Sequence, residues 1–207
     1  MQSSRKSVTA NGVKDSYQSS SAMTASEVQV QPPAFLEKQR WYQCGLHAVN
    51  NLLQRPVYAV EDFEAIAREV SAIVPGIRHK ACLGLGCYGA EVVCAAVARQ
   101  GLCVDTLNCK NTDVALRRLS GPNVVGLLLN EVESDRRWWQ LWRSQRHWLA
   151  AVRRATETNS SAYWWIIDSQ NCNGRPQKPL DTRALVSYIV QDMVECVVFI
   201  VERRNEL

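Results

Sequence analysis

Cys44 stands at the start of a stretch, CGLHAVNNLLQ, whose apolar spacing predicts a helix that ends before Pro56. A thiol at the first turn of a helix faces unpaired backbone N–H groups and the positive end of the helix dipole, which favour the thiolate. The next residue, Gly45, is small enough for a substrate backbone to come close. The pattern indicates that Cys44 is a nucleophile. The alternative is a buried unreactive cysteine, which is common in proteins. A nucleophilic cysteine also needs a general base and a group that orients this base.

Three histidines are candidates for that base. His47 follows Cys44 by three residues on the same helix, where the geometry is fixed, so we expect it to pack or hydrogen-bond beside the site. His79 lies in a polar, glycine-rich loop with no carboxylate or amide that obviously orients it. His147 opens HWLAAVRR, and YWWIIDS follows after a polar loop, which predicts an antiparallel pair of strands.

The pairing of these two strands suggests a partner for His147. If His147 lies opposite Asp168, the centre of the connection falls in the polar loop and Arg153 faces Ala162. Opposite residues share a face with Cβ atoms about 5 Å apart, so His147 could bond Asp168 with one ring nitrogen and face the thiol with the other. The structural alternatives are a turn role for Asp168 and a sheet-edge position for His147.

An oxyanion formed during thiol attack needs hydrogen-bond donors. The backbone N–H of Cys44 can provide one. Gln39, in EKQRWYQC, is a side-chain candidate on the segment that leads into the helix, and Gln43 is a rival by spacing alone. The physics of the sequence leaves both open.

Both helices and strands must position these residues. Apolar periodicity and capping signals predict helices over residues 44–54, 60–74, 89–101, 112–121 and 180–193, with Thr112 as a cap and Gly101 as a C-terminal stop. Apolar and β-branched composition predicts strands over residues 102–107, 123–130, 147–154, 163–169 and 195–204. The pattern indicates an α+β fold in which a helical portion packs on an antiparallel sheet.

Composition narrows the class of protein. The 207 residues, 46% hydrophobic, suit one domain, and a net charge of +4 spread along the chain demands no nucleic-acid partner. Eight cysteines without a C-x-x-C pair indicate free thiols in a reducing compartment and no zinc site, and no segment has the length of a membrane span. We expect a Ser/Thr/Gln-rich disordered tail over 1–33, a catalytic domain over 34–203 and a short tail over 204–207.

A tryptophan- and arginine-rich segment, residues 135–148, has several interpretations. Stacking rings and cations could bind single-stranded nucleic acid or a membrane interface. Alternatively, one or two rings cap the core under arginine stems. We favour a loop beside the active site that contacts a protein substrate, and nothing else in the sequence supports membrane association.

Three motifs together resemble one family. EKQRWYQCGLHAVNNLLQ, HKACLGLGCYGAEVVCAAVARQGL, and the pair RHWLAAVRR and YWWIIDS are similar, in order and spacing, to the motifs of the Josephin family of papain-like cysteine proteases. The resemblance covers residues 34–203, and the family carries either Asn or Asp at the position of Asp168.

The resemblance implies a thiol-dependent deubiquitinase that cleaves after the C-terminal glycine of ubiquitin. It implies Cys44 as the nucleophile, His147 as the general base, Asp168 as its orienting acid and Gln39 as the oxyanion donor, without metal or cofactor. The expected partners are ubiquitin and ubiquitinated proteins, and we expect a monomer in the cytoplasm, and in the nucleus as well. The alternative is a catalytically weak or silent ubiquitin-binding domain.

Overall fold

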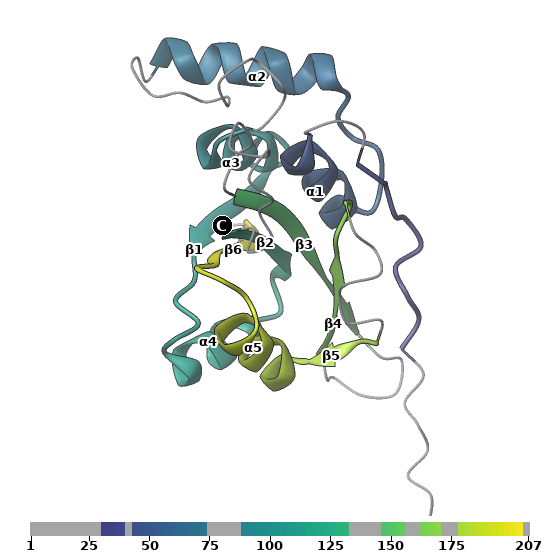
Figure 1. The fold of residues 1–207 in the computed structure, drawn as a ribbon, viewed down its shortest axis with the longest axis vertical. Helices are drawn as coiled ribbons and strands as arrows, with labels where there is room; N and C mark the ends of the chain where they lie inside the picture. Colours follow the sequence, from purple (N-terminus) through teal and green to yellow (C-terminus); the bar gives the residue numbers. More distant parts are fainter. Residues whose placement is uncertain are drawn as a thin grey trace, which may run out of the picture.

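The computed structural model describes residues 30–39, 43–73, 88–132, 146–155, 162–170 and 178–204. Its helices are α1 (Cys44–Leu53), α2 (Val60–Ile73), α3 (Ala90–Arg99), α4 (Thr112–Leu119) and α5 (Thr182–Gln191). Its strands are β1 (Leu102–Thr106), β2 (Val124–Val132), β3 (Arg146–Ala155), β4 (Ala162–Ile167), β5 (Leu180–Asp181) and β6 (Val197–Arg203). Figure 1 shows α1, α2 and α3 on one side of the sheet and α4 and α5 on the other.

The six described strands form one antiparallel sheet in the order β1-β6-β2-β3-β4-β5. β2 and β3 lie near its centre and are buried on both faces, which accounts for their nearly continuous apolar runs. The predicted α+β class with an antiparallel sheet is confirmed, and helices cover both faces of the sheet rather than one.

Alternate side chains of the central strands pack into two separate hydrophobic cores, one on each face of the sheet. On one face, α1, α2 and α3 pack against side chains that include Leu128, Trp148 and Ala150. On the other face, α4 and α5 pack against side chains that include Leu127 and Leu149. Because successive side chains of a strand point to opposite faces, a single sheet supports both cores and holds α1 firmly against β3.

Two helix starts differ in detail from the sequence prediction. Asn111, not Thr112, caps α4, because its side chain accepts a hydrogen bond from the Val114 N–H at 3.3 Å. The segment predicted to begin a helix at residue 180 first forms the short strand β5, and the Asp181 side chain then caps α5 by accepting from the Ala184 N–H at 2.7 Å. Short polar side chains favour the cap position over the helix interior, which explains both shifts.

Glycine is required where α1 crosses β2. A Cβ on Gly126 would lie 2.6 Å from the carbonyl oxygen of Ala151 and would collide with a methyl group of Leu52. We expect Gly126→Ala to lower the free energy of unfolding in urea by about 1–3 kcal/mol, because the backbone of β3 cannot move aside. Gly101→Asn is the control, since Gly101 has a φ of +75° but open space around it, and Asn tolerates this conformation. Equal stabilities of the wild type and Gly126→Ala would contradict this close approach.

Several predictions fall outside the described residues. They include the tail up to residue 29, the loop that carries His79, the connection between β3 and β4, and most of the tryptophan-rich segment. The proposed boundaries of the domain therefore stay predictions. In the parts of the chain that the structure describes, no helix is long and apolar enough to cross a membrane.

Candidate active site

Cys44 is the first residue of α1 and is buried, at 5% exposure. Gln43 occupies the N-cap position, but its side chain makes no capping hydrogen bond, and the first turn contains no acidic residue. Neither Gln43 nor a side chain of the first turn therefore neutralises the backbone N–H groups and the dipole at this helix start. Gly45 serves packing, because a Cβ there would lie 3.0 Å from a methyl group of Val93 and 3.4 Å from the Trp148 ring.

His147 and Asp168 are in direct contact. Nε2 of His147 lies 2.8 Å from Oδ1 of Asp168, and both side chains are 5% exposed. The same carboxylate oxygen accepts a hydrogen bond from the Gln170 N–H at 2.8 Å, which fixes the orientation of the carboxylate. A buried carboxylate with two donors holds the imidazole in one orientation and one tautomer.

The strand register that led to this pair was wrong by two residues. Arg153 pairs with Trp164 rather than Ala162, and Ala150 pairs with Ile167. Continued past the end of β4, this register sets Asp168 opposite Leu149, so Asp168 is a diagonal rather than a direct neighbour of His147. A shift by two leaves every side chain on its face, whereas a shift by one would have separated the two residues.

The other side of His147 interacts with Cys44. Burial alone would lower the pKa of His147, but its hydrogen bonds with Asp168 and Cys44 and the charges of both groups raise the pKa from 6.5 to about 10. The imidazole is therefore protonated at neutral pH when its partners are ionised. A protonated imidazole stabilises a neighbouring thiolate, which is the reactive form of a cysteine.

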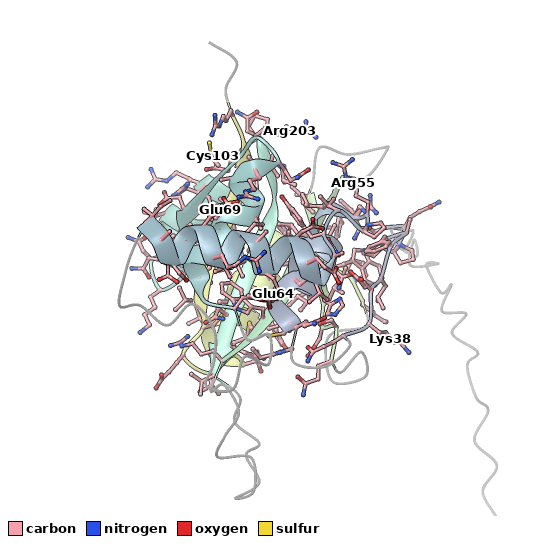
Figure 2. All side chains as sticks on the ribbon, turned by 90° about the horizontal axis from the view of Figure 1, so that it is seen from above. Lys38, Arg55, Glu64, Glu69, Cys103 and Arg203 are labelled. Carbon is pink, nitrogen blue, oxygen red and sulfur yellow. The ribbon has the colours of Figure 1, made fainter. Side chains whose placement is uncertain are left out.

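The remaining described cysteines have different surroundings. Like Cys44, the other four in this part of the chain are free thiols. Burial raises the pKa of Cys94, with a contribution from Glu91, and the pKa of Cys109, each to about 11, so both stay protonated at neutral pH. Cys103 is exposed on the edge strand β1 and is labelled in Figure 2.

Gln39 lies beside the segment that carries Asp168. Its backbone N–H donates to the carbonyl oxygen of Ser169 at 2.8 Å, and the Ser169 hydroxyl donates to Oε1 of Gln39 at 3.5 Å. Its rival Gln43 contributes its backbone carbonyl to the first turn of α1, where it accepts from the His47 N–H at 3.1 Å. Gln39 is thus bonded to Ser169, the residue that follows Asp168, whereas Gln43 is bonded to the first turn of α1.

His47 is buried on α1 and interacts with the segment before the helix. Its Nδ1 lies 3.3 Å from a carboxylate oxygen of Glu37. His79 lies outside the described residues.

Among the described residues, no group of three or more histidine, cysteine, aspartate or glutamate side chains could hold a metal ion. Of the tryptophan-rich segment, the described Trp148 is a core residue, 3% exposed, whose Nε1 donates to the Tyr88 carbonyl oxygen at 3.1 Å.

The described geometry therefore joins residues from three distant parts of the sequence. A helix-start thiol, a buried imidazole and a carboxylate interact in series, on a helix packed against an antiparallel sheet. This combination defines the class of papain-like cysteine-protease folds, in which the thiol comes from a helix and the imidazole from a strand.

Comparison with known proteins places the chain within that class. The sequence model of the Josephin family matches residues 39–202, so the chain belongs to the Josephin family. It is 32% identical to mouse Josephin-2 over 107 residues, which are 51% of this chain and 55% of that protein. It is 31% identical to human Josephin-2 over 99 residues, 48% of this chain and 51% of that protein. The chain thus spans about half the length of the curated relatives that it matches.

Proposed function

We propose that the protein is a cysteine-type deubiquitinase that hydrolyses thioester, isopeptide or peptide bonds at the C-terminal glycine of ubiquitin. The observation that carries this proposal is the series of contacts from Cys44 to His147 to Asp168 at the start of α1. Membership of the Josephin family supports it, because this family consists in general of cysteine-protease-like deubiquitinases that bind ubiquitin.

In the proposed reaction, Cys44 and His147 form a thiolate–imidazolium pair. The thiolate attacks the carbonyl carbon of the terminal glycine, and the oxyanion accepts hydrogen bonds from the Cys44 N–H and the Gln39 amide. His147 donates its proton to the leaving amine, and the C–N bond breaks to give a thioester. His147 then takes a proton from water as the water attacks the thioester, which releases ubiquitin and restores the thiolate pair.

Asp168 has a positioning role in this scheme. Its carboxylate accepts from the ring nitrogen of His147 that faces away from the thiol, so the other nitrogen is directed toward Cys44. The charge of Asp168 also favours the imidazolium form that accompanies the thiolate. No step requires a metal or an organic cofactor.

The direct test is a ubiquitin derivative with an electrophile in place of its terminal carboxylate. We expect a covalent adduct of one ubiquitin per chain, which peptide mass spectrometry assigns to Cys44. Cys103→Ala should still form the adduct, because Cys103 is exposed on β1 and takes no part in the site. A folded wild-type protein that forms no adduct, or forms it on another cysteine, would overturn the proposal and favour a silent ubiquitin-binding domain.

A further inference from the structure

A short extended segment, residues 35–39, leads to the site and is called the strap below. Along it, Phe35, Glu37 and Gln39 are half-buried, whereas Leu36 and Lys38 are exposed. Figure 1 shows this segment running beside α1, and Figure 2 shows Lys38 on the outer side of the molecule. The alternation is that of a β-strand, yet within the described sheet no strand pairs with the strap.

Side-chain amides at the C-terminal end of α1, from Asn51 and the C-cap residue Gln54, take the place of a partner strand. The Asn51 amide accepts from the Glu37 N–H at 2.7 Å and donates to the Glu37 carbonyl oxygen at 3.1 Å. The Gln54 amide repeats this pattern one turn later, accepting from the Phe35 N–H at 3.4 Å and donating to the Phe35 carbonyl oxygen at 3.2 Å. Each amide satisfies both main-chain polar groups of one residue, and the two residues alternate along the strap.

The Glu37 side chain adds a second attachment at the same point. One of its carboxylate oxygens accepts from the Asn50 amide at 2.8 Å and lies 3.3 Å from Nδ1 of His47. Asn50 and Asn51 are both fully buried at 0% exposure, so the hydrogen bonds that they make to the strap are specific and costly to lose. Glu37 is therefore the most firmly held residue of the strap.

The next inward-facing residue after Glu37 is Gln39. Its N–H continues the pattern of main-chain hydrogen bonds by donating to the Ser169 carbonyl oxygen at 2.8 Å. The Ser169 hydroxyl donates to Oε1 of the Gln39 side chain at 3.5 Å, which leaves the amide nitrogen available as a donor. Gln39 is thus held between α1, through Glu37, and the residue that follows Asp168.

We propose that Asn51 is a positioning residue for the reaction, because its hold on Glu37 sets the place of the Gln39 amide relative to Cys44. This inference rests on the proposed function, in which Gln39 stabilises the oxyanion. Since an oxyanion donor acts on charge that develops in the transition state, a misplaced Gln39 lowers kcat and leaves KM nearly unchanged. A displacement of about 1 Å can reduce the rate by about 100-fold.

The test uses Asn51→Asp, which keeps the acceptor for the Glu37 N–H but puts a buried carboxylate oxygen in place of the donor to the Glu37 carbonyl oxygen. We expect kcat for a ubiquitin C-terminal reporter to fall about 10- to 100-fold with KM within about twofold of wild type. Gln39→Ala should lower kcat by about 100-fold or more, and adding Asn51→Asp to it should cause almost no further loss. That lack of additivity separates a positioning role from general loss of structure.

Gln54→Gly is the control, because it removes the amide clamp from Phe35, farther from Gln39, together with the contacts of this amide to Arg154 and the Asn51 carbonyl oxygen. Glycine suits the left-handed conformation at this position, where φ is 57°, so the helix end is preserved. We expect a loss of kcat of less than about threefold, well below the loss for Asn51→Asp.

Glu37→Ala provides a second variant at a less buried residue, should Asn51→Asp fail to fold. It removes the carboxylate attachment and should also lower kcat. This loss should nearly disappear when Gln39→Ala is already present. Unchanged kcat in either folded variant would overturn the positioning role of Asn51. Losses that multiply with the loss caused by Gln39→Ala would overturn it as well. In both cases, an active wild type leaves the proposed function intact. An inactive wild-type chain would overturn both.

Discussion

Replacement of Cys44 by alanine is expected to abolish hydrolysis of a ubiquitin C-terminal reporter, with kcat/KM at least about 10⁴-fold below wild type. Cys44 is the thiol at the start of α1 that interacts with His147, and burial keeps Cys94 and Cys109 protonated. Among the described thiols, only Cys44 interacts with His147, so we expect no other described thiol to replace it. The measurement is a fluorescence release assay on matched amounts of folded protein.

The same variant separates chemistry from binding. Alanine is smaller than cysteine and uncharged, so Cys44→Ala should keep its fold and still bind ubiquitin in calorimetry. Cys103→Ala is the control, because it also removes one thiol but lies on the exposed edge of β1, and it should keep wild-type turnover. Reporter hydrolysis by purified Cys44→Ala at a rate close to wild type would refute a covalent role for Cys44.

Asp168→Ala is expected to weaken turnover without abolishing it, by roughly 100- to 1000-fold in kcat/KM. The loss arises because Nε2 of His147 loses its acceptor at 2.8 Å and the imidazole is no longer directed toward the thiol. Asp168→Asn provides the matched comparison, since an amide oxygen can still accept from His147 and from the Gln170 N–H. We therefore expect Asp168→Asn to be much more active than Asp168→Ala.

The pH dependence of Asp168→Asn gives a second measurement on the same residue. Hydrogen bonds and charges from Asp168 and Cys44 raise the pKa of His147 to about 10 against the opposing effect of burial, so the imidazolium persists to high pH. The alkaline fall of kcat/KM should lie near this value in the wild type. Removing the carboxylate charge lowers the pKa of His147, so the fall should move to lower pH in Asp168→Asn.

Stability should follow the same titration. A histidine whose pKa is raised on folding stabilises the native state fully below its unfolded pKa, near 6.5, and this contribution is lost as the pH rises through about 10. The free energy of unfolding should therefore fall more steeply between pH 7 and 10 in the wild type than in Asp168→Asn. An alkaline limb at the same pH in both proteins, or wild-type turnover in Asp168→Ala, would remove Asp168 from the proposed site.

The contact between His147 and Asp168 could be predicted from the sequence, but the strand register could not. Cys44 could be chosen from the chemistry of a helix start, and His147 and Asp168 from two apolar strands joined by a polar loop. The predicted register assumes that the loop lies symmetrically between the two paired strands. A loop does not have to be symmetric in this way, so the strands can pair two residues out of the predicted register. The error of two residues preserved the face of each side chain, so the contact between His147 and Asp168 was predicted despite it.

Gln39 shows what sequence reasoning cannot resolve alone. Spacing allowed either Gln39 or Gln43 to approach Cys44, and only the resemblance to a known family favoured Gln39. The contacts that hold the strap were missed, although a signal was present. Asn50 and Asn51 are fully buried polar side chains on a largely apolar helix, and buried polar side chains require partners that a sequence does not name.

The attachment of the strap has a consequence for motions of the folded protein. Its N–H groups at Phe35, Glu37 and Gln39 bond to two side chains and one carbonyl group, whereas β2 pairs with strands on both sides. In native-state hydrogen exchange, the strap amides should therefore exchange through local opening, and those of β2 only through global unfolding. In such a locally open molecule, thiol, imidazole and carboxylate remain assembled while the oxyanion donor is displaced. We therefore expect turnover to decline on heating before the sheet melts.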